Sequence, residues 1–323
     1  MLINGQRSEE LRVAVIHDGI LEHYQVEKAT AGLQKANIYV GYVTSIQKNL
    51  NAAFVDYGFI KDGFLPAKEV SARAIGYKDK GDEGGYHIEQ MLQRKKRVLV
   101  QVTNDAVGAK GAALTTNVSL AGRYLVLTPF DSSKGVSRKV EDEKTRKLLR
   151  DRIKGLDLPE GMGCIVRTNA VGQAKTSLNR DLNALLRLWK RITKEASSGG
   201  QPRLVYSDQD LMIQALRDYL DATISEVWVD SESHVKRANS FMKVFMPRSK
   251  VRLESYTERL PLFSKFKLEE QIEAIYKRRV ELPGGGSIVI DPTEALTAID
   301  VNSGKQHSGS HEETVYRTNK EAA

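Results

Sequence analysis

The stretch Ala52-Ala53-Phe54-Val55-Asp56-Tyr57-Gly58, followed by Gly63-Phe64-Leu65-Pro66, specifies the architecture of the region around it. Each run is short, rich in apolar residues and bounded by turn residues, which predicts a β-strand. Five short strands separated by glycine and charged turns are what an OB-fold barrel requires. We therefore expect such a barrel over residues 34–116. The three further strands that this barrel needs are predicted at residues 38–46, 98–102 and 112–114.

A second informative stretch is Thr297-Ala298-Ile299-Asp300-Val301-Asn302-Ser303-Gly304, which follows a predicted strand at residues 287–290 and a turn at Asp291-Pro292. In an extended strand, residues two apart point to the same face. Asp300 and Asn302 would then lie side by side at the strand end, where they could hold a hard cation. The alternative is an Asx-turn, in which both side chains cap their own backbone.

The rest of the chain mixes strand and helix patterns. The clearest helical stripe lies in residues 177–196, where apolar side chains recur at three- and four-residue spacing. Residues 71–89 are rich in Gly, Lys and Asp, which predicts a surface loop. The other predicted elements are strands at residues 11–16, 21–26 and 226–229 and helices at residues 142–154, 210–220, 233–241 and 267–279.

The charge balance favours an anionic partner. Lys and Arg number 49 against 41 acidic residues, which gives a net charge of +8. An excess of this size is compatible with nucleic-acid binding, although many soluble proteins reach it by chance. Basic residues cluster at residues 93–97 and 243–279, either as anion-binding surfaces or as solvated faces.

Cysteine usage and hydropathy indicate the compartment. Cys164 is the single cysteine, so the chain can form no internal disulfide and no cysteine-based zinc site. No apolar run is long enough for a membrane-spanning helix, and Met1-Leu2-Ile3-Asn4-Gly5 lacks the features of a signal peptide. We expect a cytoplasmic protein.

Motifs along the whole chain resemble the bacterial ribonuclease E/G family. They include residues 35–41, 52–58 and 63–66, then 110–116, 120–124 and 161–168, and finally 284–300. The resemblance implies an α+β multidomain fold. Its expected parts are an RNase H-like subdomain at residues 1–33 and 209–276, an inserted OB-fold RNA-binding domain at residues 34–116, a 5′-sensor domain at residues 117–208, and the start of a DNase I-like catalytic subdomain at residues 277–323.

The resemblance also implies a function, which is endonucleolytic cleavage of single-stranded RNA in RNA processing and decay. Phe54, Phe64 and Lys110 match the residues with which the family grips RNA, although an isolated Phe in a strand is more often part of a core. Four further residues match the family's pocket for a 5′-terminal monophosphate. They are Gly122, Val126, Arg167 and Thr168.

The family holds Mg²⁺ with two aspartates, one of them oriented by an asparagine. Asp300 matches the first aspartate, as metal ligand, and Asn302 matches the asparagine. The second aspartate, a zinc-binding cysteine motif and the region that assembles homo-oligomers are expected beyond Ala323, so we interpret the chain as an N-terminal fragment with weak or no nuclease activity. Ser310 and Glu313 form a capping box that predicts a final helix. The alternative function is a non-catalytic single-stranded RNA-binding protein.

Overall fold

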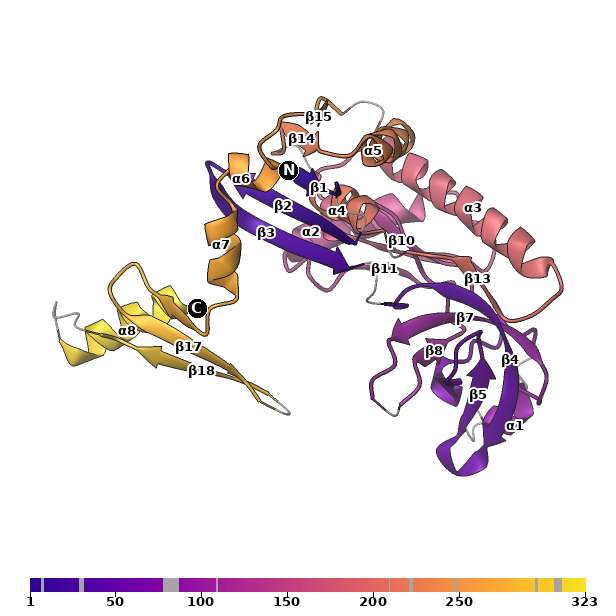
Figure 1. Ribbon diagram of the computed structural model, residues 1–323. Helices are drawn as coiled ribbons and strands as arrows, with labels where there is room; N and C mark the ends of the chain where they lie inside the picture. Colours follow the sequence, from indigo (N-terminus) through magenta and orange to yellow (C-terminus); the bar gives the residue numbers. More distant parts are fainter. Residues whose placement is uncertain are drawn as a thin grey trace. The chain divides into compact units, whose positions relative to one another are not determined.

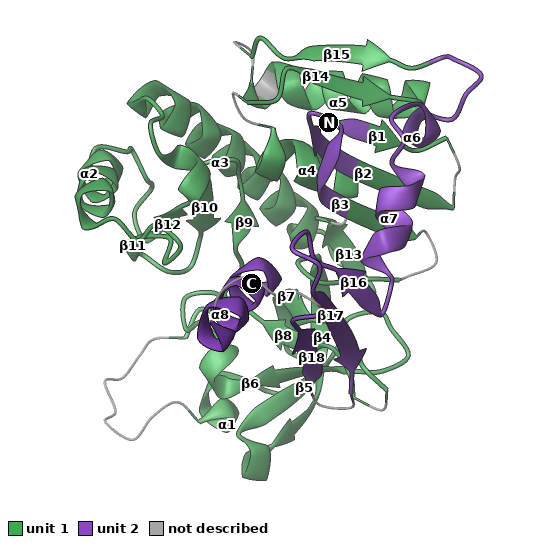
Figure 2. Cartoon of the chain, turned by 90° about the vertical axis from the view of Figure 1, so that its left-hand side faces the viewer, with its two compact units in different colours: residues 1, 3–13, 25–256 green, residues 2, 14–24, 257–323 purple. Residues whose placement is uncertain are grey.

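The computed structural model describes residues 1–6, 9–28, 32–77, 87–108, 110–208, 210–220, 223–246, 249–293, 296–304 and 310–323, and of residue 244 only the backbone. The structure is mixed α+β, as predicted. The chain divides into two compact units, and Figure 2 colours unit 1 green and unit 2 purple. Unit 1 comprises residues 1, 3–13 and 25–256, and unit 2 comprises residues 2, 14–24 and 257–323. Among the described helices, none is both long and apolar enough to cross a membrane.

The five strands predicted around the opening stretch form a closed barrel in unit 1 (Figure 1). Its sheet has the order β13-β4-β5-β6-β8-β7, and β4 closes the barrel by pairing with β7 as well. This arrangement is consistent with an OB-fold. The strands are β4 (Ile38–Gln47), β5 (Ala52–Asp56), β6 (Gly63–Pro66), β7 (Arg97–Asn104), β8 (Ala113–Thr115) and β13 (Arg203–Tyr206), with the short helices η1 (Lys48–Leu50), η2 (Ala67–Glu69) and α1 (Ile88–Met91) between them.

A second sheet of unit 1 follows the barrel, with the order β11-β12-β10-β9. Helix α3 packs on β9 and β10 through the predicted apolar stripe, which is buried at Leu178, Leu182 and Leu185 among others. Helix α2 packs on β11 and begins at the N-cap Asp142, whose carboxylate accepts from the Thr145 N–H at 2.8 Å. The elements are β9 (Leu120–Ala121), β10 (Leu125–Thr128), β11 (Lys134–Val136), α2 (Glu143–Lys154), β12 (Gly163–Val166), η3 (Thr168–Ala170) and α3 (Lys175–Ser197).

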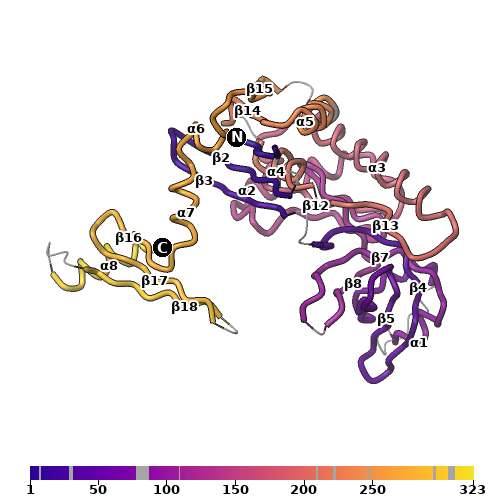
Figure 3. Tube along the Cα trace, in the orientation of Figure 1, coloured from indigo at the N-terminus to yellow at the C-terminus, as the bar shows by residue number. Residues whose placement is uncertain are grey.

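The third sheet joins segments from both ends of the first 256 residues, in the order β15-β14-β1-β2-β3. The Trp228 N–H donates to the Met1 carbonyl at 2.9 Å, so β14 pairs with β1. In Figure 3 the indigo strands and the orange β14 and β15 can be followed into this sheet. The elements are β1 (Leu2–Asn4), β2 (Glu10–His17), β3 (Ile20–Lys28), α4 (Leu211–Tyr219), β14 (Glu226–Val229), α5 (Glu232–Phe245) and β15 (Arg252–Ser255), with α5 packed on β14, β15 and α4.

Unit 2 contains the three-stranded antiparallel sheet β16-β17-β18. The predicted turn at Asp291-Pro292 is wrong, because these residues belong to β17 and pair with Ala298 and Thr297 of β18. Pro292 is tolerated there because it is the last residue of the strand, where its missing N–H costs little. The elements are α6 (Leu262–Lys265), α7 (Glu269–Ile275), β16 (Arg279–Glu281), β17 (Ser287–Pro292), β18 (Thr297–Asn302) and α8 (His311–Ala322).

Other predictions differ from the structure in their boundaries. The helix predicted at residues 267–279 is shorter, because Arg279–Glu281 pairs with β17 as β16. Ser310 is the N-cap of α8, as the predicted capping box requires, with the Glu313 N–H donating to Ser310 Oγ at 3.3 Å. Of the loop predicted at residues 71–89, residues 78–86 lie outside the described residues.

Candidate functional site

Phe54 and Phe64 form an aromatic pair on the outer face of the barrel. They lie directly opposite each other in β5 and β6, with ring centroids 5.8 Å apart in an edge-to-face arrangement. Their strand neighbours Ala53, Val55 and Leu65 are fully buried in the barrel core. Since alternate strand residues point to opposite faces, the two half-buried rings lie outside that core. This placement favours a base-stacking role over a packing role.

The backbone brings Lys110 to the same edge of the barrel. The Phe64 N–H donates to the Ala112 carbonyl at 2.7 Å, so the segment that leads from Lys110 runs beside β6. Gly111 is required in this segment because a Cβ there would lie 2.1 Å from the Asp62 carbonyl oxygen. Lys110 is exposed. Lys110 thus lies three residues before Ala113, the residue of β8 that pairs with Phe64.

Gly122 lies in a turn that is held by a buried carboxylate. Asp181 of α3 accepts the backbone N–H groups of Arg123, Tyr124 and Leu125 at 3.1, 2.8 and 2.9 Å. Burial raises the pKa of the Asp181 carboxyl, although these three hydrogen bonds and the charge of Arg167 act in the opposite direction. A Cβ at Gly122 would lie 2.5 Å from Asp181 Oδ2, so this close approach requires glycine.

Arg167 lies directly after β12 and contacts this turn. Its Nη1 donates to the Gly122 carbonyl at 2.7 Å, and its backbone N–H donates to the Tyr124 carbonyl at 2.8 Å. Thr168 is exposed and begins η3, and Val126 pairs with Ile165 in the same sheet. The structure thus brings Gly122 and Arg167 into contact and places Val126 and Thr168 on the neighbouring strand and turn.

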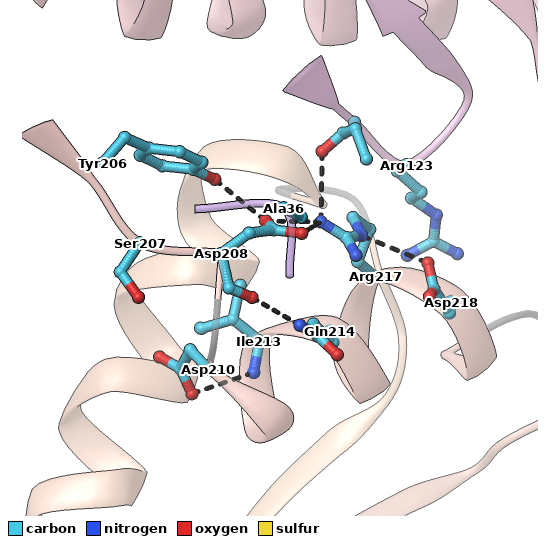
Figure 4. Close-up of polar contacts among 12 residues, drawn as sticks. Ala36, Arg123, Tyr206, Ser207, Asp208, Asp210, Ile213, Gln214, Arg217 and Asp218 are labelled. Atoms are coloured by element: carbon cyan, nitrogen blue, oxygen red, sulfur yellow. Dashed lines mark hydrogen bonds and ion pairs between the residues drawn. The ribbon is translucent and has the colours of Figure 1, made fainter. Parts of the chain in front are cut away.

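A buried ion-pair network behind this turn was not predicted from the sequence (Figure 4). Arg217 Nη1 lies 3.1 Å from Asp208 Oδ1 and 3.2 Å from the Ala121 carbonyl oxygen. Arg217 Nε lies 3.2 Å from Asp218, which also pairs with Arg167 at 2.8 Å. Burial opposes the charge of Arg217, but the two carboxylates outweigh it and raise its pKa. The sequence feature that could have indicated this network is the pair Arg217-Asp218 at the end of the apolar helix α4.

Asp300 and Asn302 lie side by side on β18, as the strand periodicity predicts. The Asn302 carboxamide donates to Asp300 Oδ2 at 2.9 Å, and both residues are exposed. Asp300 lies opposite Val289 and Asn302 opposite Ser287 in β17. The asparagine therefore orients the carboxylate and leaves its second oxygen available for a ligand.

A complete metal site is not formed by the described residues, which contain no group of three His, Cys, Asp or Glu arranged to hold an ion. The nearby Asp291 is paired bidentately with Arg278 at 2.5 and 2.8 Å, which lowers the pKa of its carboxyl. Asp300 can thus supply one hard oxygen ligand, of the type that Mg²⁺ prefers. Cys164 is buried in β12.

Comparison with known proteins identifies relatives over the full length of the chain. The sequence model of the Ribonuclease E/G family matches residues 119–323. Ribonuclease E of Haemophilus influenzae is 44% identical over 100% of this chain and 34% of its own length. Ribonuclease E of Escherichia coli K12 is 43% identical over 100% of this chain and 30% of its own length. Ribonuclease G of Escherichia coli K12 is 33% identical, with 66% of its length covered. The chain spans about a third of the length of the two ribonucleases E.

Proposed function

This chain belongs to the ribonuclease E/G family, and on that premise we propose that it provides the RNA-binding region and part of the catalytic centre of an endoribonuclease acting on single-stranded RNA. The observation that carries RNA binding is the outward-facing Phe54–Phe64 pair on a closed barrel. Bases stack on the two rings, and Lys110 contacts the phosphate backbone.

The 5′-monophosphate site is proposed at the turn around Gly122. Arg167 donates to the terminal phosphate with the guanidinium nitrogens that Asp218 and Gly122 do not engage, and the Thr168 hydroxyl adds a donor. Val126 forms the apolar side of the site. A 5′-hydroxyl RNA offers no dianion to Arg167, so it binds more weakly at this position.

At β18, Asp300 is the proposed ligand of Mg²⁺ and Asn302 holds its carboxylate in position. Magnesium, when bound, activates water and offsets the charge on the scissile phosphate. The Asp300 carboxylate can occupy one coordination position of the ion. The strand pairing with β17 fixes the direction in which the carboxylate points.

The domain assignment follows the same premise. We assign the barrel to an OB-fold RNA-binding domain over residues 34–116 and the β9–β12 sheet to a 5′-sensor domain over residues 117–208. The sheet that joins β1, β2 and β3 to β14 and β15 is assigned to a discontinuous RNase H-like subdomain over residues 1–33 and 209–276. Residues 277–323 are assigned to the start of a DNase I-like subdomain.

The function is tested with an A/U-rich single-stranded oligonucleotide and its duplex, each with a 5′-monophosphate, with and without magnesium. Preferential binding of the single strand supports the proposal, and equal binding of the duplex contradicts the role of the aromatic pair. The alternative is a non-catalytic single-stranded RNA-binding protein. Metal-dependent cleavage by a longer chain, lost on Asp300→Asn, would exclude that alternative.

A further inference from the structure

A basic pocket lies in unit 1 next to the Gly122 turn, but it does not include Arg167, Thr168 or Val126. Its volume is about 640 Å³. Four cationic side chains line it, and the described residues of its wall include no carboxylate. These cations are Arg123, Arg180, Lys250 and Arg252.

Arg123 is the least exposed of the four, with 7% of its surface accessible. Its Nη2 donates to the Leu220 carbonyl, its Nη1 contacts Met246 Sδ, and its Cζ lies 5.2 Å from the centroid of the Tyr124 ring. The buried Nε has no hydrogen-bond partner. A buried cation and an unsatisfied donor both cost free energy unless an anion or acceptor reaches them.

Asp181 accepts the backbone N–H of Arg123, and three further carboxylates of unit 1 pair with other arginines. Asp208 and Asp218, which are drawn with Arg123 in Figure 4, pair with Arg217, and Asp210 pairs with Arg237. Within the described part of the chain, no carboxylate pairs with Arg123. The hydrogen-bond contacts of this guanidinium in the described structure, the Leu220 carbonyl and Met246 Sδ, are thus both uncharged.

Helix α3 contributes a second feature to the pocket. Gln173, Thr176, Ser177 and Arg180, at or near its first turn, line the pocket. The N-cap residue is Ala174, which has no side-chain acceptor for the first-turn amides. A 23-residue helix with an uncapped N-terminus attracts negative charge.

The opposite wall supplies Lys250, which is exposed, and Arg252, which pairs with Glu226. Phe245 also lines the pocket, and its ring stacks on Phe241 with centroids 4.7 Å apart. Cations on two walls and an aromatic ring beside them suit a phosphate that carries a nucleoside.

We propose that this pocket, the Arg123 pocket, binds an internal phosphate of the RNA strand, at a position separate from the barrel face and from the 5′-phosphate site. The inference rests on the proposed RNA-binding function. The same phosphate chemistry could also be presented by a free mononucleotide, and the experiment distinguishes these two sources.

The test uses the whole 323-residue chain. The variant Arg180→Gln/Lys250→Gln removes two pocket cations for which the described residues form no ion pair. Its matched control is Lys190→Gln/Lys194→Gln, which removes two exposed charges from α3 outside the pocket. Arg123 is left intact because its hydrogen bond to Leu220 contributes to folding. The probes are a long 5′-hydroxyl oligouridine, which does not engage the 5′-phosphate site, and AMP.

We expect the pocket variant to bind the oligouridine about tenfold more weakly near physiological salt. Each phosphate that the protein neutralises contributes about 0.7 to the magnitude of the slope of log affinity against log salt. The magnitude of the slope should fall by about 0.7 for the one phosphate that the pocket no longer neutralises. The control should change neither quantity by a comparable amount.

Three other results would overturn the inference. An unchanged affinity and slope in the pocket variant would show that RNA does not reach the pocket. Unchanged RNA affinity together with AMP binding that the variant loses, measured by calorimetry, would assign the pocket to a free nucleotide. No binding of RNA by the parent chain would refute the proposed function as well, whereas RNA binding by the parent chain that the pocket variant retains refutes the Arg123 pocket alone.

Discussion

Arg167 and Asp218 form an ion pair with an Nη1–Oδ1 distance of 2.8 Å, and the same nitrogen donates to the Gly122 carbonyl at 2.7 Å. Both contacts use one nitrogen, so Nε and Nη2 of the guanidinium remain for a ligand in the described structure. The ion pair therefore orients Arg167 and leaves two guanidinium nitrogens for the proposed phosphate.

Arg167→Ala should abolish the preference for 5′-monophosphate over 5′-hydroxyl RNA while leaving the affinity for 5′-hydroxyl RNA nearly unchanged. The reason is that Arg167 is the cation in contact with the Gly122 turn. Competition titration of the two RNA forms measures the preference. Arg138→Ala removes an exposed arginine elsewhere and serves as control. A preference that persists in the Arg167 variant contradicts the assignment.

Asp208→Ala should lower the free energy of unfolding by about 3–5 kcal/mol, because it leaves the buried guanidinium of Arg217 with one of its two carboxylate partners. Urea denaturation measures the change. The exposed Asp157→Ala should change stability by about 0.5 kcal/mol or less. Equal stability of the two variants would show that the network does not stabilise the fold.

Phe54→Ala and Phe64→Ala should each weaken single-stranded RNA binding by about 1–3 kcal/mol, the usual contribution of a base–aromatic stack. Both should fold, because the rings lie outside the barrel core. Leu65→Ala provides the contrast, since this fully buried side chain should cost about 2–5 kcal/mol of stability. Phe59→Ala controls for loss of an exposed ring. If the Phe54 and Phe64 variants unfold as Leu65→Ala does, the rings belong to the core.

Burial raises the pKa of the Cys164 thiol to about 11. The folded state thus favours the protonated thiol, so this contribution to stability is fully present below the ordinary thiol pKa and is lost as the pH rises through about 11. At pH 8 the folded chain should resist alkylation by iodoacetamide, and urea should restore labelling. Rapid labelling of the folded chain would show that the thiol is accessible.

The barrel, the α3 helix and the Asp300–Asn302 contact could be predicted because each depends on local periodicity. Two-residue spacing placed Asp300 beside Asn302, whereas an RNA-contacting role for Phe54 and Phe64 was expected only from the family resemblance. The Arg217 network could not be predicted in this way. It joins α4 to the segment after β13 and to the β9 turn, and these contacts depend on tertiary packing that residue spacing does not encode.

The turn between β17 and β18 was misplaced for a related reason. Proline usually marks a turn, but here Pro292 closes a strand whose pairing with Thr297 outweighs the local signal. The strands β13 and β15 were missed because each has four residues and pairs with strands distant in the sequence.

The last prediction concerns cleavage by residues 1–323, which should bind RNA but turn it over very slowly. In the described residues Asp300 supplies one carboxylate, and no further acid joins it in a metal-holding group. A single carboxylate leaves Mg²⁺ mostly hydrated and poorly placed, because the ion needs a near-octahedral oxygen shell fixed against the substrate phosphate. Turnover of a 5′-monophosphorylated oligonucleotide should therefore depend little on magnesium.

Two variants make this test specific. Asp300→Asn removes the proposed ligand, while Asp291→Asn removes the acid in the same hairpin that is engaged by Arg278. Neither should change RNA affinity, because neither residue belongs to the barrel face. Robust magnesium-dependent cleavage by the parent chain that Asp300→Asn abolishes and Asp291→Asn retains would show that the metal site is complete within these residues.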